Sequence, residues 1–188
     1  IGGTGIYELA GMQVQQRLDA ATPFGQPSGQ IVKGRLAGRE LLFLARHGAG
    51  HKLLPHEVNY RANIYALKRA GATQILGFSA VGSLVQEIAP GDLAMPSQYF
   101  DWTKGGRARS FFGEGVAAHV STAQPASARL IDWAAGQAQA LGLRLLMGDR
   151  APLLPSEGLR LLDDLCGLGP GEAAPRAAGL LALGVHLP

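Results

Sequence analysis

Gly2-Gly3-Thr4-Gly5, close to the start of the chain, has the composition of a loop that binds an anion. Glycine allows backbone N–H groups to approach a ligand closely, and the hydroxyl group of Thr4 adds another donor. A phosphate group fits these donors. An ordinary tight turn after a strand uses glycines in the same way, so this segment taken alone supports a phosphate loop and a plain turn about equally.

Arg46 and His47 follow an apolar run at residues 40–45 that we expect to be a strand. The planar guanidinium group of Arg46 presents several N–H donors in a fork that matches phosphate oxygens. His47 adds another donor. Taken alone, the two residues are more typical of a surface arginine in an ion pair and a structural histidine. Whether they bind phosphate depends on which residues lie beside them.

Ser79 and Ala80 belong to residues 73–83, in which a buried strand is expected to lead into a turn of small residues. Ligands of open α/β sheets bind beyond the carboxyl ends of the strands. If the strands that end at Ile1, Ala45 and the residue before Ser79 lie side by side and parallel, their donors converge on one phosphate site. If these strands are not neighbours, the donors stay apart.

Two other kinds of site are less well supported. A dinucleotide-binding G-x-G-x-x-G pattern would need a third glycine where the chain has Glu8. His47, His51 and His56 suggest a metal, but their spacing matches no common zinc pattern and Glu57 is the only acidic residue beside them. We therefore expect neither a dinucleotide cofactor nor a bound metal.

The elements that must position these residues alternate between strands and helices. Strands are predicted at residues 31–36, 40–45 and 93–95 and in the first part of 73–83, before its turn of small residues, and helices at 57–70 and 126–141. This order predicts an α/β fold with a mixed, twisted sheet flanked by helices. We expect one domain over residues 1–188, with a divergent or truncated tail at 151–188 that holds a short helix at 159–165 and a strand at 180–185.

Composition excludes several classes of function. Hydrophobic residues make up 47% of the chain, yet no apolar run has the length of a membrane span, so we expect no membrane partner. A net charge of +3 is compatible with a small anionic substrate and too weak to favour nucleic acid. The single cysteine, Cys166, has no base beside it and cannot form an internal disulfide, which favours a reducing compartment and predicts a cytoplasmic protein.

Taken together and in this order, the motifs resemble the methylthioadenosine phosphorylase branch of the purine nucleoside phosphorylases. The resemblance extends from Ile1 to about Leu145. It is carried by IGGTG, TPFGQPS at 22–28, LARHG at 44–48, PHEVNYRANIYAL at 55–67, SAVGSL at 79–84 and EIAPGD at 87–92. The sequences of RHG-x-x-H and of the segment at 55–67 are similar to those of bacterial members that prefer methylthioinosine.

In this family, inorganic phosphate attacks the anomeric carbon of a purine nucleoside and releases the purine. The resemblance therefore implies phosphorolysis of 5′-methylthioinosine or 5′-methylthioadenosine in purine salvage, with phosphate as co-substrate and no other cofactor. It also implies a homotrimer with a nucleoside phosphorylase-like fold that is incomplete at its C-terminus. It puts His51 near the mouth of the site, and it assigns the phosphate to Thr4, Arg46, His47, Ser79 and the backbone N–H of Ala80.

The resemblance stops after the second predicted helix. The family's E-G-P-R-F motif, its Met-Thr pair and its purine-binding Asn or Asp have no recognisable counterpart in residues 148–188. Loss of one group that stabilises a leaving group commonly costs about 10²–10³ in rate. Two interpretations follow. The chain is a phosphorylase whose tail supplies other purine contacts, or it is a non-catalytic remnant that keeps phosphate binding or self-association.

Overall fold

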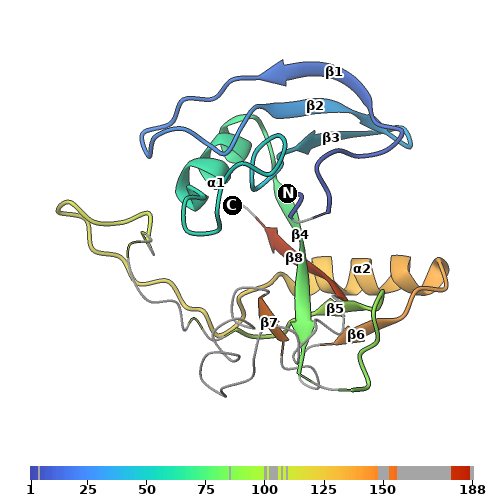
Figure 1. Cartoon of the computed structure of the whole chain (residues 1–188). Helices are drawn as coiled ribbons and strands as arrows, with labels where there is room; N and C mark the ends of the chain where they lie inside the picture. The colour runs from blue at the N-terminus through green and yellow to red at the C-terminus, as the bar shows by residue number, and fades with distance from the viewer. Residues whose placement is uncertain are drawn as a thin grey trace. The chain divides into compact units, whose positions relative to one another are not determined.

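The computed structural model describes residues 1–3, 5–84, 86–99, 101, 106, 108 and 110–147, together with the backbone of two strands at 153–155 and 179–186. These residues form two compact units (Figure 1). The first takes in Ile1–Ile75 and Asp101–Thr122, and the second takes in Leu76–Phe100 and Ala123–His186. Each unit has its own sheet, and the expectation that residues 1–188 act as one domain stays a prediction.

The first unit contains a three-stranded antiparallel sheet in the order β1-β2-β3. β1 spans Gln13–Leu18, β2 spans Ile31–Leu36 and β3 spans Arg39–Phe43. The turn between β2 and β3 has positive φ at both Ala37 and Gly38, 48° and 77°, as a two-residue hairpin turn requires. The prediction of β2 is confirmed. β1 was missed because its sequence, QVQQRL, is polar and its side chains are mostly exposed.

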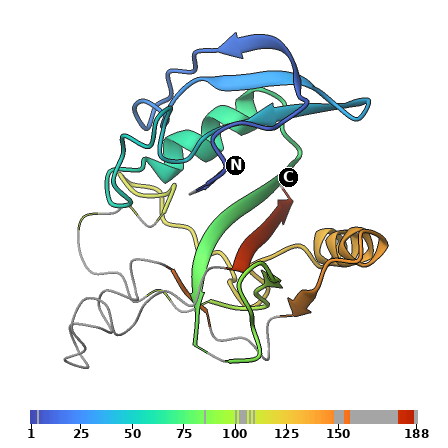
Figure 2. The same cartoon turned by 45° about the vertical axis from the view of Figure 1, so that its right-hand side comes forward.

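One helix, α1 (Tyr60–Arg69), lies against one face of this sheet (Figure 1 and Figure 2). Its amphipathic spacing puts a stripe of apolar side chains toward the strands. The resulting core of the first unit is formed by Ile31, Leu44, Ala66, Leu67 and Ile75.

The sequence predicts that this helix begins at Glu57, but in the structure it begins at Tyr60. The reason is the side chain of Asn59, whose oxygen accepts a hydrogen bond from the N–H of Ala62 at 3.1 Å and so caps the helix. Glu57 instead accepts a hydrogen bond from the N–H of Leu54 at 2.7 Å and closes a turn before the helix.

The second unit contains a five-stranded sheet in the order β6-β5-β8-β4-β7. β5 is parallel to β6 and β8, whereas β7 is antiparallel to β4, so the sheet is mixed. α2 (Ala128–Ala140) lies next to β6 and β8. The predicted α/β fold with a mixed sheet is confirmed, and its strands are β4 (Gln74–Ser83), β5 (Leu93–Met95), β6 (Leu145–Met147), β7 (Leu153–Pro155) and β8 (Gly179–His186).

β4 differs from the prediction at residues 79–83, where we expected a turn. The strand continues to Ser83 because its last three residues pair with β7, with Gly82 opposite Leu154. A partner strand from the tail therefore keeps this glycine-containing segment extended. Elsewhere in the tail, the strand expected at 180–185 is confirmed as β8, and the helix expected at 159–165 lies outside the described residues.

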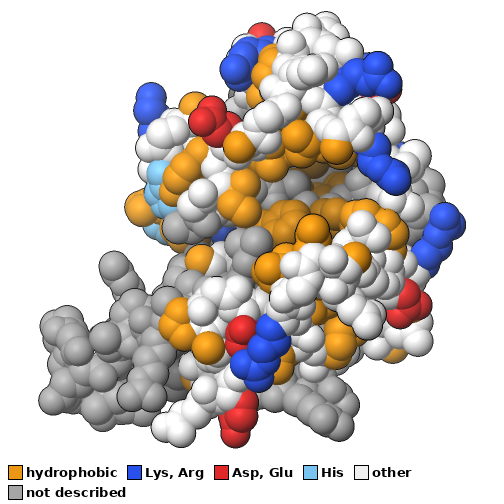
Figure 3. Space-filling view, turned by 90° about the vertical axis from the view of Figure 1, so that its right-hand side faces the viewer, with side chains coloured by type: hydrophobic (Ala, Val, Ile, Leu, Met, Phe, Trp, Pro, Cys, Tyr) orange, Lys and Arg blue, Asp and Glu red, His pale blue; other side chains and the backbone are white. Residues whose placement is uncertain are grey.

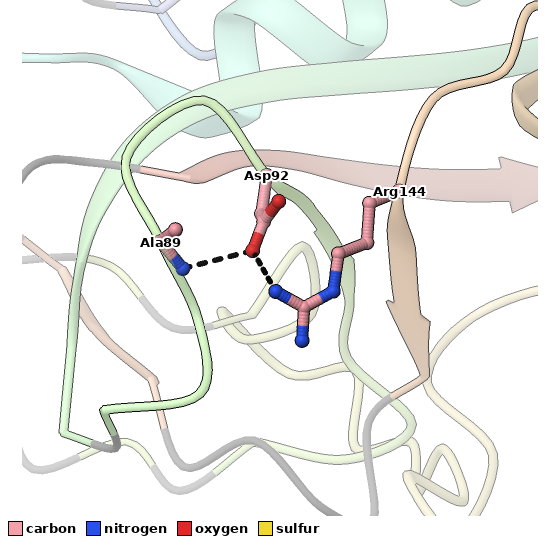
Figure 4. A network of polar contacts seen from close by, with 3 residues as sticks. All are labelled: Ala89, Asp92 and Arg144. Atoms are coloured by element: carbon pink, nitrogen blue, oxygen red, sulfur yellow. Dashed lines mark hydrogen bonds and ion pairs between the residues drawn. The ribbon is translucent and has the colours of Figure 1, made fainter.

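Asp92 ties the start of β5 to the start of β6 (Figure 4). Its Oδ2 accepts one hydrogen bond from the backbone N–H of Ala89 and one from Nη1 of Arg144, both at 2.8 Å. The N–H of Leu93 donates to the carbonyl of Arg144 at 3.0 Å. Gly91, with φ of 91°, closes the turn that brings Ala89 back to Asp92. The EIAPGD motif therefore fixes the register of two parallel strands.

Apolar side chains also remain on the surface of the described residues. Trp133, Leu141 and Leu143, on and just after α2, are 47%, 73% and 48% exposed. Figure 3 shows apolar side chains on the face drawn there, with Lys and Arg side chains scattered over it and not gathered into one patch. None of the described helices combines the length and the apolar character that crossing a membrane requires.

We expect Asp92→Ala to destabilise the fold more than Arg144→Ala. The side chain of Asp92 is 12% exposed and satisfies a backbone N–H, so its loss should cost about 1–3 kcal/mol. The side chain of Arg144 is 52% exposed, and ion pairs of that kind contribute about 0–1 kcal/mol. Denaturant unfolding of both variants measures the two losses, and equal losses would contradict this account.

Candidate functional site

A short parallel pairing joins the start of the chain to the residues that follow β3. The N–H of Gly2 donates to the carbonyl of Leu44 at 2.9 Å, and the N–H of Arg46 donates to the carbonyl of Gly2 at 2.8 Å. Gly2 and Ala45 thus form a parallel bridge. The strand expected at residues 40–45 leaves the β2 ladder after Phe43 because its continuation pairs with Gly2. Two of the three strand ends considered above are therefore parallel neighbours.

The glycine-rich loop closes as a tight turn directly after this bridge. The N–H of Ile6 donates to the carbonyl of Gly3 at 3.1 Å, and Gly5 has φ of 87°. Gly2 is needed for a different reason, because a Cβ there would overlap the carbonyl oxygen of Ile6 and lie 2.8 Å from the ring of Phe43. Thr4 lies outside the described residues, so its role stays a prediction.

His47 is engaged through both nitrogens of its ring. The residue is 3% exposed, and its Nδ1 lies 2.9 Å from the carbonyl oxygen of Leu53. Because a carbonyl oxygen only accepts, Nδ1 carries a proton in this arrangement. Nε2 is an acceptor, and the Nε–H of Arg46 donates to it at 3.3 Å. In this arrangement the ring of His47 directly contacts the side chain of Arg46.

His51 covers the ring of His47. The two rings are stacked, with centroids 4.5 Å apart and planes 18° apart. Positive φ values at Gly48, Gly50 and His51 turn the loop back on itself and allow this stacking. The hydroxyl group of Tyr7 is hydrogen bonded to Nδ1 of His51 at 2.9 Å. Sequence reasoning missed Tyr7, for which the only signal was an aromatic hydroxyl just after the glycine-rich loop.

A buried asparagine on α1 supports the same region. Asn63 is 2% exposed, its Oδ1 accepts from the N–H of Ser28 at 2.7 Å, and its Nδ2 donates to the hydroxyl oxygen of Ser28 at 2.9 Å. The carbonyl oxygen of Ser28 lies against Gly48, where an added Cβ would approach it to 2.9 Å. Three of the segments that carried the resemblance therefore pack together at the loop that follows Arg46.

Ser79 and Ala80 are positioned by the second unit. Both lie within β4 and are partly buried. The structure brings Arg46, His47 and His51 together with the glycine-rich loop in the first unit, and it describes Ser79 and Ala80 with the second.

Among the described residues, no group of three or more His, Cys, Asp or Glu side chains is arranged to hold a metal ion.

We expect Gly2→Ala and Gly5→Ala to be destabilising for different reasons. A Cβ at Gly2 meets backbone and a ring, which should cost about 1–3 kcal/mol. A Cβ at Gly5 meets nothing within 4 Å, so only its backbone conformation is strained, at about 1 kcal/mol. Asparagine tolerates positive φ, so Gly5→Asn should be milder than Gly5→Ala, whereas Gly2→Asn should be no better than Gly2→Ala. Thermal unfolding of the four variants measures their stabilities. A Gly2→Asn variant more stable than Gly2→Ala would contradict this account.

Comparison with known proteins gives a consistent result. A model of the Phosphorylase superfamily matches residues 1–148. The S-methyl-5'-thioadenosine phosphorylase of Geobacter sulfurreducens is 52% identical over 130 residues, which cover 69% of this chain and 46% of that protein. The protein of the same name from Hyperthermus butylicus is 43% identical over 145 residues, which cover 77% of this chain and 53% of that protein. The chain thus spans about half the length of these curated relatives.

Solved structures agree with this assignment. A methylthioadenosine phosphorylase from an Antarctic soil metagenomic library is 42% identical with a TM-score of 0.70, and the match covers 78% of this chain and 52% of that one. A variant of the adenosine/methylthioadenosine phosphorylase of Schistosoma mansoni is 26% identical with a TM-score of 0.74, covering 97% and 69%. The resemblance inferred from the motifs is confirmed, and the family model matches as far as residue 148. The chain belongs to the Phosphorylase superfamily.

Proposed function

We propose that this chain carries the phosphate-binding part of a purine nucleoside phosphorylase that cleaves 5′-methylthioadenosine or 5′-methylthioinosine. The names of its relatives support the reaction and the first of these nucleosides. The sequence of the RHG-x-x-H motif supports 5′-methylthioinosine.

The observation that carries the proposal is the parallel pairing of Gly2 with Ala45. It sets a loop of small residues, with backbone N–H groups that can approach a ligand, next to Arg46. Backbone N–H groups and a guanidinium group are the donors that proteins use to bind phosphate. The pairing therefore supports an anion site over a plain turn and a surface arginine, the alternatives that each motif left open when taken alone.

In the proposed reaction, an oxygen of inorganic phosphate forms a bond to the anomeric carbon while the bond from that carbon to the purine nitrogen breaks. The bonding electrons leave with the purine, which then takes up a proton. The products are free purine and 5-methylthioribose 1-phosphate. Because the sugar becomes cationic on the way, a phosphate held beside it both attacks and stabilises the charge.

The proposed site residues are those that the motifs predict. Inorganic phosphate is the co-substrate, and the proposal uses no metal or other cofactor. His51 lies toward the entrance, and the phosphate is held by Thr4, Arg46, His47, Ser79 and the backbone N–H of Ala80.

We also propose a homotrimer in the cytoplasm. The exposed apolar side chains of Trp133, Leu141 and Leu143 are compatible with contacts between copies of the chain. The single cysteine is compatible with a reducing compartment.

A second candidate function is phosphate binding without catalysis. The observation in its favour is that the family match ends at residue 148, before the region in which the family's purine contacts would be expected. A chain without those contacts could hold the nucleophile and still fail to assist the departure of the purine.

We expect the purified chain to release purine from 5′-methylthioadenosine or 5′-methylthioinosine only when phosphate is present. The rate should be about 10²–10³ lower than that of a full-length relative, because one stabilising group for the leaving purine is missing. Chromatography of the free base measures the rate, and the same reaction with sulfate in place of phosphate is the control. A folded chain that binds phosphate and releases no purine above background would favour the second candidate.

Arg46→Ala should weaken the binding of inorganic phosphate by about tenfold or more, because a charge-assisted hydrogen bond is lost. Isothermal titration calorimetry measures the affinity. Arg17→Ala is the matched control, since it removes the same charge from an exposed position on β1. Equal affinities for the two variants would reject a phosphate site at Arg46.

A further inference from the structure

We propose that Tyr7 is a positioning residue that fixes the orientation and the tautomer of His51, so that the Nε2–H of His51 is offered as a donor to an oxygen atom of a substrate. The inference rests on the proposed function, in which His51 lies toward the entrance of the site. It adds Tyr7 to the residues on which that site depends. The oxygen atom belongs either to inorganic phosphate or to the ribose of the nucleoside, since both accept the same hydrogen bond.

Tyr7 and His51 join two segments that are far apart in the sequence. Tyr7 follows the glycine-rich loop, and His51 belongs to the loop after Arg46. The hydroxyl oxygen of Tyr7 lies 2.9 Å from Nδ1 of His51. The two rings also meet edge to face, with centroids 5.7 Å apart and planes 84° apart. Two different contacts with one side chain therefore hold the ring of His51 at the start of the chain.

The contacts of His51 leave one edge of its ring for a ligand. One face is stacked on the ring of His47, with centroids 4.5 Å apart, and His47 is itself buried. The Nδ1 edge is taken by Tyr7. Among the described residues, Nε2 of His51 has no hydrogen-bond partner, and the residue is exposed.

The backbone of His51 points to a role for the side chain. Its φ of 54° lies in the left-handed region, which glycine adopts at little cost and other residues adopt less readily. The N–H of His51 donates to the carbonyl of Gly48 at 3.3 Å and closes the turn. A glycine would form this turn with less strain. The presence of a histidine in this conformation therefore favours a function for its ring beyond the turn itself.

The hydrogen bond to Tyr7 decides which ring nitrogen of His51 carries a proton. In a neutral imidazole, one nitrogen donates and the other accepts. The lone pairs of a phenolic oxygen are partly delocalised into its ring, so a phenol is a better donor than acceptor. We therefore assign the hydroxyl group of Tyr7 as the donor and Nδ1 of His51 as the acceptor. The proton of the imidazole then lies on Nε2.

Tyr7→Phe removes the hydroxyl group and keeps the ring that meets His51. Long-range ¹H–¹⁵N correlation spectra in mildly alkaline buffer report the tautomer, and His51→Gly, which suits the positive φ, assigns the signals. We expect a proton on Nε2 of the wild type and a mixture of tautomers in Tyr7→Phe. A proton on Nδ1 of the wild type, or the same tautomer in both proteins, overturns the inference. A residue that only braced the loop through its ring would leave the tautomer unchanged.

Calorimetric titration tests whether this hydrogen bond matters for substrates. We expect Tyr7→Phe to bind either inorganic phosphate or 5′-methylthioinosine about fivefold more weakly, the effect of one misplaced hydrogen bond. The ligand that loses affinity identifies the oxygen atom that accepts from His51. Tyr99→Phe is the matched control, because it removes the same hydroxyl group from a tyrosine of the second unit that is 58% exposed. Affinities of Tyr7→Phe equal to those of this control for both ligands overturn the inference.

A double-mutant cycle shows whether Tyr7 acts through His51. Adding Tyr7→Phe to His51→Gly should cause no further loss of affinity, because the ring that Tyr7 positions is already absent. A loss of the same size with and without His51, in variants that thermal unfolding shows to be folded, contradicts the positioning role. A wild-type chain that binds neither ligand overturns the proposed function, whereas the tautomer measurement still decides the bond to Tyr7.

Discussion

The hydrogen bonds that Gly2 exchanges with Leu44 and Arg46 are the constraint on which the candidate site depends. They join the start of the chain to the end of β3 in the parallel direction, so the glycine-rich loop and the Arg46-His47 pair begin at the same place. The pairing is possible only because Gly2 has no side chain, since the carbonyl of Ile6 and the ring of Phe43 fill the space where a Cβ would lie. One glycine therefore couples two motifs that are far apart in the sequence.

Around this pairing, the motifs shared with the family have mostly structural roles. Asn63 holds Ser28, Ser28 packs against Gly48, and Gly48 permits the turn that brings His51 over His47. The polar side chains of these motifs thus mostly contact one another, and the last of them, His47, contacts the charged side chain of Arg46. These contacts would order the proposed phosphate site before the ligand arrives, which would lower the entropy lost on binding.

The sequence predicted those parts of the site that depend on residue type. It did not predict conformations that depend on contacts with residues far away in the sequence. Arg46 and the glycines could be chosen because their donors suit phosphate, and β2 and the body of α1 follow from apolar spacing. The bond from Arg46 to His47 could not be foreseen, because adjacent residues of a strand point to opposite sides and only the departure from β3 brings them together. The extended course of β4 at 79–83 was missed because its partner β7 comes from the tail. Asn59 was within reach of prediction, since asparagine is a favoured helix cap.

The position of β8 in the five-stranded sheet bears on how the chain reaches its fold. This strand lies between β5 and β4, although it follows both of them, and α2, in the sequence. A ribosome that has made everything up to residue 178 has therefore produced two strand edges with unpaired backbone groups and no strand yet to close them. Contacts between such distant residues form late and slowly, and open edges meanwhile invite pairing with other chains. The time for which these two edges stay open during synthesis is thus set by the position of β8 in the sequence, independently of any chemistry at Arg46.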